Sequence, residues 1–260
     1  CDEVEYTFLA LNRRAVERAI ALKEQGAPIH RVLTGQIATS ASYAKKNMKR
    51  TQEELFQEAA ESVKLLHQNG IKCVAANVGT IFGCPIEGEM PLGRAYDFVA
   101  RLLDMGFDEI EHSDPDGAAS PDRMAEYCAE IMRRWPDPSI HVLHVHDIHG
   151  MGIASYYAAL KQGIRQFECA LGRTGGQPAN HMDGMPVHGT GDYYFTQGPT
   201  GLVSTEDFVG MLDRMEYFTG VDMEKLISAG CLAEKLFGRT LGSFVVAGQM
   251  HEQVQMAVGS

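Results

Sequence analysis

The sequence predicts an α/β fold in which helices cover a parallel sheet. Strand-like and helix-like segments alternate strictly along the 260 residues, which is typical of βαβ units. No G-x-G-x-x-G follows a predicted strand, which weakens the case for a doubly wound dinucleotide-binding sheet. Polar residues gather where successive strands end, and in a (β/α)8 barrel all these ends meet on one face. Either architecture accommodates the alternation, and the polar strand ends favour the barrel.

Six segments have the short apolar pattern of buried parallel strands. A closed barrel needs eight strands, so the pattern is two βα units short. The predicted strands are residues 4–10, 30–36, 71–78, 108–113, 140–146 and 166–171.

The predicted helices begin at capping residues. Asn12 and Ser120 are expected N-caps, with Pro121 at the first helical position, and Thr51 with Glu54 forms a capping box. Loops are expected at 37–50, 79–91 and 172–204, and the predicted helices cover about 12–24, 51–69, 92–105, 151–162 and 222–236, with one more from 120, one from Ser204 or Thr205, and a last one at 242–257.

Composition excludes two classes of partner. The net charge of −11 argues against nucleic acid, which requires a basic face. No apolar run approaches the 18 or so residues of a membrane span, so no membrane association is expected. The six cysteines are irregularly spaced and include no C-x-x-C, which predicts reduced thiols and a cytoplasmic location.

The segment 141–150 (HVLHVHDIHG) carries the main candidate site. Alternate side chains of a strand share a face, so His144 and His146 point the same way. Two imidazoles at a strand end can bind one divalent metal ion. They could instead be two hydrogen-bonded core histidines, but Asp147, Gly150 and the glycine-rich segment downstream favour the metal site.

Several motifs in order resemble those of hydroxymethylglutaryl-CoA lyases, over residues 4–240 or so. The strand-end histidine motif is similar to the family's H-x-H-D-T-Y-G. The other matching blocks are Phe82–Gly88 (FGCPIEG), Ser113–Gly117 (SDPDG), Gly175–Pro178 (GGQP), Thr205–Asp207, Thr219–Val221 and Ala229–Gly230.

This resemblance implies a metal-dependent (β/α)8 barrel that makes or breaks a carbon–carbon bond beside a carbonyl. It implies that His144 and His146 bind the metal, with Mg²⁺ or Mn²⁺ expected ahead of Zn²⁺. Asp114 corresponds to a strand-end aspartate near the substrate, a candidate for proton transfer or substrate orientation, although it could equally close a loop. The candidates for substrate binding are Asn77, Thr80 and Gln36.

The chain departs from the family pattern at two functional positions. Gln177 stands where the lyases have a reactive cysteine, and it can orient an oxygen but cannot act as a thiol acid. Leu202 stands where the family has a metal-binding asparagine. An insertion at 179–197 contains His188, which we consider a candidate replacement ligand, although a substrate lid is the simpler interpretation.

The family's opening strand, with its metal-binding carboxylate and catalytic arginine, has no counterpart before Val4. Together with the strand count, this predicts a preceding segment of roughly 40–60 residues that supplies two βα units.

We therefore expect a single barrel domain that cleaves a β-hydroxy acid or its CoA thioester. A condensing synthase of the same family, a metal-dependent hydrolase on a barrel and a non-catalytic homologue are the alternatives. The position of the histidine pair on the fifth predicted strand disfavours the hydrolase, because the H-x-H of such hydrolases typically lies on the first strand. A homodimer is plausible through apolar residues of the last segment, namely Met250, Val254 and Met256.

Overall fold

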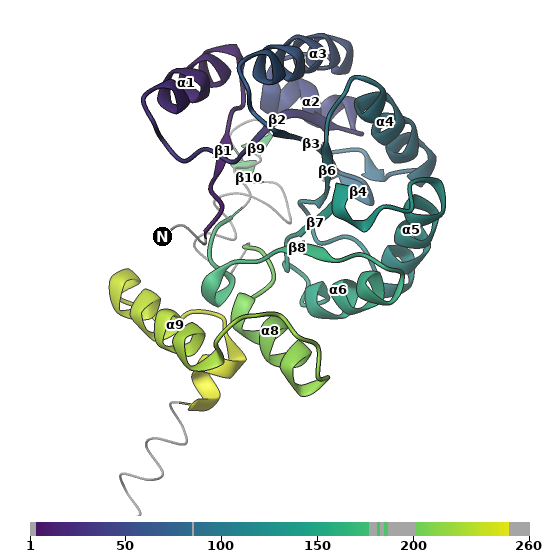
Figure 1. The fold of residues 1–260 in the computed structure, drawn as a ribbon. Coiled ribbons are helices and arrows are strands. Elements are labelled where there is room, and N and C mark those ends of the chain that lie inside the picture. The colour runs from purple at the N-terminus through teal and green to yellow at the C-terminus, as the bar shows by residue number, and fades with distance from the viewer. Residues whose placement is uncertain (1–3, 85, 177–180, 183–184, 187–200, 250–260) are drawn as a thin grey trace, which may run out of the picture.

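The computed structural model describes residues 4–84, 86–176, 181–182, 185–186 and 201–249, and its centre is a curved parallel sheet (Figure 1). The strands lie in the order β1-β2-β3-β6-β7-β8, and all five pairings are parallel. The predicted parallel sheet is confirmed as a half-barrel of six strands: β1 (Thr7–Leu9), β2 (Arg31–Ala38), β3 (Cys73–Gly79), β6 (Glu109–Asp114), β7 (His141–Val145) and β8 (Gln166–Glu168).

The helices lie on the convex side of the sheet, and Figure 1 shows α1 to α6 following one another around the arc. After β8 the chain crosses to α8 and α9, which lie below the sheet in that view. The helices are α1 (Arg13–Glu24), α2 (Ala41–Met48), α3 (Gln52–Gln68), α4 (Leu92–Asp104), α5 (Pro121–Arg134), α6 (Gly152–Lys161), α8 (Thr205–Arg214) and α9 (Met223–Phe237), with 3₁₀ turns at Pro138–Ile140 and Leu171–Arg173 and a helical segment at 244–249.

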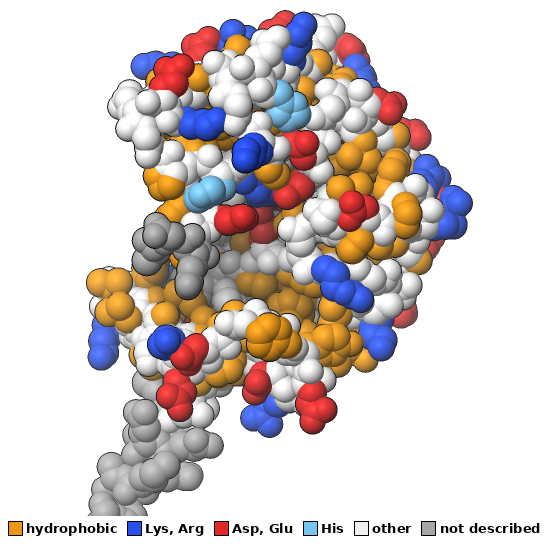
Figure 2. Space-filling model, viewed as in Figure 1, with side chains coloured by type: hydrophobic (Ala, Val, Ile, Leu, Met, Phe, Trp, Pro, Cys, Tyr) orange, Lys and Arg blue, Asp and Glu red, His pale blue; other side chains and the backbone are white. Residues whose placement is uncertain are grey.

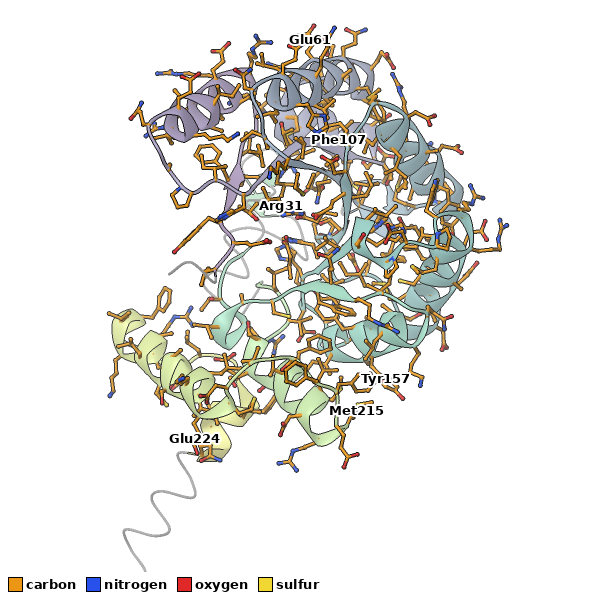
Figure 3. All side chains as sticks on the ribbon, in the orientation of Figure 1. Arg31, Glu61, Phe107, Tyr157, Met215 and Glu224 are labelled. Carbon is orange, nitrogen blue, oxygen red and sulfur yellow. The ribbon has the colours of Figure 1, made fainter. Side chains whose placement is uncertain are left out.

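The curvature of the sheet brings side chains of distant strands together on its concave side. Arg31 on β2 lies 3.8 Å from Glu168 on β8, although three strands separate β2 from β8. In a flat sheet those strands would be roughly 19 Å apart, at about 4.8 Å per strand. Figure 3 shows Arg31 projecting into the hollow of the arc, whereas Phe107 lies toward the helices.

The expected caps are present, and they explain where the helices begin. Asn12 and Ser120 accept hydrogen bonds from the backbone N–H groups of Ala15 and Arg123. Thr51 and Glu54 form the predicted reciprocal capping box.

The prediction of a loop over 37–50 is wrong. β2 continues to Ala38, and Ser40 then caps α2 by accepting a hydrogen bond from Tyr43 N–H at 3.0 Å. Glu87 reinforces this start, because its Oε1 accepts hydrogen bonds from the Ser40 hydroxyl and the Ser42 N–H at 2.7 Å each. The stabilising partner comes from a residue 47 positions away, so no local pattern identified it.

Two short antiparallel ribbons lie outside the main sheet. One is β4 (Gly83–Cys84) with β5 (Gly88–Glu89), inside the predicted loop 79–91, and the other is β9 (His181–Met182) with β10 (Met185–Pro186), inside the insertion. The remainder of the insertion, Gln177 and His188 included, lies outside the described residues, as do Met250, Val254 and Met256 of the expected dimer contact.

The two faces of the central strands differ in chemistry. The convex face packs apolar side chains such as Val74, Ile110 and Leu143 against the helices in the main hydrophobic cluster. The concave face carries charged and polar side chains instead, and the space-filling view shows a hollow there with acidic and histidine side chains on its wall (Figure 2). Within the described ranges, no helix is both long enough and apolar enough to cross a bilayer.

Candidate metal and active site

The two histidines of the strand-end motif meet on the concave face, as the sequence predicted. His144 lies in β7, and His146 follows the strand with its backbone N–H donating to the Asp114 carbonyl oxygen at 3.0 Å. Their Nε2 atoms are 3.2 Å apart. Both residues are largely removed from solvent, since His146 is 6% exposed and the His144 side chain 23% exposed.

Glu168 contacts the other edge of the His144 ring. Its Oε2 lies 2.8 Å from His144 Nδ1, a distance that fits an Nδ1–H donating to the carboxylate. This hydrogen bond assigns the proton to Nδ1 and leaves the Nε2 lone pair directed toward His146.

Glu111 is the second carboxylate beside His144. Its Oε1 lies 3.7 Å from His144 Nδ1 and accepts a hydrogen bond from Asn77 Nδ2 at 2.5 Å. The side chain is 3% exposed, and its buried Oε2 has no hydrogen-bond partner. A buried carboxylate oxygen without a partner is costly, and it indicates that a cation or a donor group belongs nearby.

Arg31 and Glu109 extend this network along the concave face. Arg31 Nε donates to Glu109 Oε2 at 2.6 Å, and its Nη1 lies 3.8 Å from Glu168 Oε1. The five side chains of Arg31, Glu109, Glu111, His144 and Glu168 come from four strands of the sheet, with Glu109 and Glu111 two residues apart on β6. Of these five side chains, the sequence had identified only His144 as a candidate site residue. The available signal was the alternation of Glu109 and Glu111 in a segment predicted to be a buried strand, since such charges are buried only when paired.

Burial and charge act in opposite directions on these groups. Burial raises the pKa of Glu111, with the Glu168 charge adding to the shift and His144 opposing it. Burial would lower the pKa of His144, but its hydrogen bond to Glu168 and the charges of Glu111 and Glu168 outweigh that effect and raise it. The site thus stabilises positive charge at His144.

The donor set fits a divalent metal ion. Two imidazole nitrogens that bind one ion at about 2.0–2.1 Å lie roughly 3 Å apart, which matches the separation of the two Nε2 atoms. The carboxylates of Glu111 and Glu168, with His144, form a further group whose ligand atoms lie within 4.8 Å of one another. Three carboxylates face one guanidinium in this network, so a cation would also balance the excess negative charge.

Asp114 is placed to organise a loop. It is fully buried, and its two carboxylate oxygens accept hydrogen bonds from the backbone N–H groups of Ala118 and Ala119 at 3.1 and 2.9 Å. Gly117 in the same loop packs against the backbone of His146, where an added Cβ would lie 2.5 Å from the carbonyl oxygen. The loop after β6 therefore supports the histidine motif directly.

The three residues expected to bind substrate lie in different surroundings. Asn77 joins the site through Glu111. Gln36 lies opposite Asn77 in the β2–β3 register and is half-buried. Thr80 is buried, with its Oγ1 accepting a hydrogen bond from Ser40 N–H at 3.1 Å, so its hydroxyl joins the ends of β2 and β3.

Asp147 fixes the loop after β7. Its Oδ1 accepts a hydrogen bond from Gly152 N–H at 2.8 Å, and Arg173 lies 3.2 Å from its Oδ2. Glu206 and Asp207 do more than place negative charge at the start of α8. Glu206 accepts a hydrogen bond from Gly172 N–H, and Asp207 accepts them from the backbone N–H groups of residues 244 and 245.

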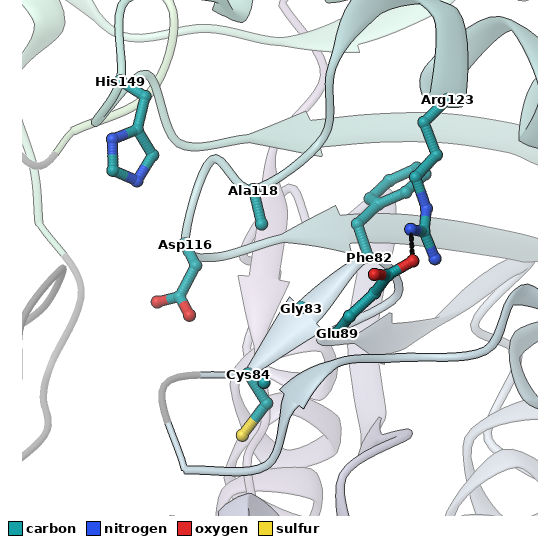
Figure 4. Close-up of a pocket in the computed structure, with 9 residues that line it drawn as sticks. Phe82, Gly83, Cys84, Glu89, Asp116, Ala118, Arg123 and His149 are labelled. Atoms are coloured by element: carbon teal, nitrogen blue, oxygen red, sulfur yellow. Dashed lines mark hydrogen bonds and ion pairs between the residues drawn. The ribbon is translucent and has the colours of Figure 1, made fainter.

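A cavity of about 340 Å³ lies between the β4–β5 ribbon and the loops after β6 and β7 (Figure 4). Asp116, which is 8% exposed, lines it, and burial together with the Asp114 charge raises the pKa of Asp116 to about 7. Arg123 and Glu89 form an ion pair across the cavity from Asp116. The full lining is Phe82, Gly83, Cys84, Gly88, Glu89, Asp116, Ala118, Arg123 and His149.

The parallel half-barrel with a histidine pair at a strand end defines an α/β protein of the TIM-barrel type with a candidate metal site, and comparison with known proteins identifies the family. The HMGL-like family model matches residues 5–232, so the chain belongs to this family. This result confirms the resemblance drawn from the motifs, and with it the prediction of a carbon–carbon lyase of hydroxymethylglutaryl-CoA lyase type.

Three relatives illustrate the similarity. The chain is 30% identical to (R)-citramalyl-CoA lyase of Chloroflexus aurantiacus, over 97% of this chain and 73% of the relative. It is 28% identical to hydroxymethylglutaryl-CoA lyase YngG of Bacillus subtilis, over 92% and 72%. A solved HMG-CoA lyase from Acinetobacter baumannii, in complex with coenzyme A and 3-methylmalate, superposes with a TM-score of 0.82 at 25% identity, covering 95% of this chain and 73% of that one.

Proposed function

We propose that this protein is a divalent-metal-dependent lyase that cleaves a β-hydroxyacyl-CoA thioester into a carbonyl compound and a smaller acyl-CoA. The observation that carries the proposal is the pair of imidazole Nε2 atoms 3.2 Å apart at the end of β7, in a chain of the HMGL-like family. The relatives act on citramalyl-CoA and hydroxymethylglutaryl-CoA according to their names, and both names describe cleavage. That naming supports the lyase over the condensing synthase.

The bound ion would polarise the carbonyl and hydroxyl oxygens of the substrate and offset the negative charge that develops as the bond breaks. In such a cleavage the β-hydroxyl loses its proton, the Cα–Cβ bond breaks, and its electron pair passes to the thioester carbonyl as an enolate. A proton then returns to the α-carbon, so atoms and charge balance.

The residues of this chain would divide these tasks. His144 and His146 would hold the ion, with Mg²⁺ or Mn²⁺ favoured by the mixture of imidazole and carboxylate groups around them. We assign Asp114 to the loop that supports His146, because both its oxygens are engaged by backbone N–H groups. Gln177 stays a candidate for orienting a substrate oxygen, and His188 for a further ligand.

Substrate identity is the finer part of this proposal. The chain lacks the cysteine and the asparagine that the hydroxymethylglutaryl-CoA lyases carry, with Gln177 and Leu202 at those positions. We therefore favour a related β-hydroxyacyl-CoA such as citramalyl-CoA. We also propose that the protein works in the cytoplasm, since the five cysteines among the described residues are all free thiols.

The test is a cleavage assay with purified protein and Mn²⁺ or Mg²⁺, offered citramalyl-CoA and hydroxymethylglutaryl-CoA separately. Mass spectrometry of the acyl-CoA pool reports the products. We expect release of a smaller acyl-CoA that stops when EDTA is added and resumes with excess Mn²⁺. Cleavage that survives complete chelation would overturn the metal-dependent mechanism, and no cleavage of any β-hydroxyacyl-CoA in a wider panel would overturn the lyase assignment.

A further inference from the structure

His144 has a well-defined environment on the edge of its ring that faces away from His146. The ring donates from Nδ1 to Glu168 Oε2 at 2.8 Å, which is the short distance of a charge-assisted hydrogen bond. The Glu168 side chain is 31% exposed, while His144 is 23% exposed, so water competes only in part for this bond.

Glu168 is itself held from across the sheet. Arg31 Nη1 lies 3.8 Å from Glu168 Oε1, the oxygen that does not bond His144. Arg31 in turn is fixed by a 2.6 Å hydrogen bond to Glu109, and its side chain is 14% exposed. The carboxylate of Glu168 is thus oriented at both oxygens, one by a guanidinium on β2 and the other by the imidazole on β7.

From this geometry we infer that Glu168, oriented by Arg31, is a positioning residue that fixes His144 with its proton on Nδ1 and its Nε2 lone pair available to a divalent ion. The inference deepens the proposed function and rests on it for the identity of the ion. The physical reason is that a neutral imidazole has two tautomers, and only one of them presents Nε2 as a ligand. A carboxylate on Nδ1–H selects that tautomer, sets the ring orientation and makes Nε2 a stronger donor.

The sheet explains why this arrangement needs the curved fold. His144 and Glu168 are direct neighbours in the β7–β8 register, so their side chains project from the same point of the concave face. Arg31 reaches them only because the arc brings β2 round toward β8. A flat sheet would leave Glu168 without its guanidinium.

The experiment measures Mn²⁺ binding to the full chain by electron paramagnetic resonance titration. Glu168→Gln keeps the size of the side chain and an acceptor oxygen but loses the charge, while Glu168→Ala loses both. We expect the dissociation constant to rise about 10- to 100-fold, with the alanine variant at the upper end. Glu87→Gln is the control, because it makes the same change of charge and the hydrogen bonds of Glu87 go to Ser40 and Ser42, outside the network of Arg31, Glu168 and His144. Its dissociation constant should stay within about threefold of the unmodified protein.

A second readout does not depend on the metal. In metal-free protein labelled with ¹⁵N-histidine, at a pH above the raised pKa of His144 where the ring is neutral, the ring should show a protonated Nδ1 and an unprotonated Nε2. Glu168→Ala should convert this signal to a mixture of tautomers, while Glu87→Gln should leave it unchanged. Circular dichroism and the midpoint of urea unfolding establish that each variant is folded.

Two results would overturn the inference, and both are distinct from a failure of the proposed function. One is wild-type Mn²⁺ affinity in both folded Glu168 variants. The other is an unchanged His144 tautomer in folded Glu168→Ala. If the unmodified protein itself bound no Mn²⁺, the metal-dependent function would fail, and the tautomer measurement would still decide the positioning role.

Discussion

The sheet carries two histidine pairs, one on each face, and they are built on opposite plans. On the concave face, His144 and His146 direct two Nε2 atoms at each other at 3.2 Å, and the carboxylates of Glu111 and Glu168 lie beside the Nδ1 edge of His144. On the convex face, His112 Nε2 lies 3.0 Å from His141 Nδ1, under the cover of α5. Both pairs are mostly buried, so burial alone does not separate a ligand pair from a structural pair.

The difference lies in where the hydrogen bonds of each pair end. His141 Nε2 donates to the Trp135 carbonyl oxygen at 2.8 Å, which requires its Nδ1 to accept from His112 Nε2–H. The His112 Nδ1 must then accept from the Tyr127 hydroxyl, at 2.8 Å. Every donor and acceptor of the convex pair is satisfied by protein groups, so it has no lone pair for a ligand. In the concave pair, the His144 Nδ1–H donates to Glu168 and the His144 Nε2 atom faces His146 Nε2, an arrangement that would suit a shared cation.

The largest expected effect comes from breaking the concave pair. His144→Ala and His146→Ala should each weaken Mn²⁺ binding and the rate of thioester cleavage by more than about 100-fold, because each removes one of two imidazole ligands. Calorimetric Mn²⁺ titration and an acyl-CoA product assay measure these two quantities. The matched control is His141→Ala on the convex face, which should lower the stability but leave the affinity of correctly folded protein within a few-fold of the original. Equal loss of Mn²⁺ affinity in all three folded variants would contradict the distinction between the pairs.

The next effect comes from breaking the convex pair. His112→Leu should lower the free energy of unfolding by roughly 2 kcal/mol or more, since it leaves the Tyr127 hydroxyl and His141 Nδ1 buried without partners. Urea unfolding followed by circular dichroism gives the value. Tyr127→Phe removes only the hydroxyl donor at the end of this hydrogen-bonded relay, so the free energy of unfolding should fall by about 1 kcal/mol. A His112→Leu protein as stable as the original would show that this relay contributes nothing.

The pH dependence of stability should have opposite signs for the two faces. Burial, with the neighbouring His141, lowers the pKa of His112, and burial also lowers the pKa of His141. These residues stay neutral in the folded protein but take up protons when unfolded, so their contribution is lost as the pH falls below about 6.5. The pKa of His144 is raised, so its contribution is present below about 6.5 and is lost as the pH rises through the folded value.

Metal-free variants separate these two contributions. Between pH 7.5 and 5.5, His112→Leu should lose less stability on acidification than the unmodified protein, and His144→Leu should lose more. Each histidine contributes at most about 1.4 kcal/mol per pH unit. Urea unfolding at several pH values in this range gives the slopes, and slopes that change in the same direction for both variants would contradict the assignment.

The smallest expected effect is a gain in Mn²⁺ affinity. Leu202 forms a backbone bridge with His146, so this position lies beside the His144–His146 pair, and the resemblance places an asparagine ligand here in the family. Leu202→Asn should tighten Mn²⁺ binding by less than about tenfold, because an amide oxygen adds one weak ligand. Leu202→Ala serves as the control for lost apolar bulk. An Mn²⁺ affinity that is the same in the asparagine and alanine variants would show that position 202 does not reach the ion.

The sequence was sufficient for most of the architecture, because alternation and capping are local signals. Asn12, the capping box of Thr51 with Glu54, and Ser120 fixed three helix starts correctly. α2 was missed because its cap, Ser40, is reinforced by Glu87 from a distant ribbon. Long-range support of this kind leaves no periodic pattern within the helix itself.

The candidate site was predicted only in part, for a similar reason. His144 and His146 share a strand, and period two alone places them on one face. Glu111, Glu168 and Arg31 join them through sheet register and curvature, and neither property can be calculated from spacing along the chain. Asp114 shows the converse, because its motif position suggested contact with substrate while its oxygens bond the backbone of its own loop.

The most direct test of the central claim is electron spin-echo spectroscopy of Mn²⁺ bound to the ¹⁵N-histidine-labelled protein. We expect coupling to two directly coordinated imidazole nitrogens, reduced to one in either His144→Ala or His146→Ala and unchanged in His141→Ala. A bound ion that shows no imidazole coupling in the unmodified protein would contradict the claim that the strand-end pair forms the metal site.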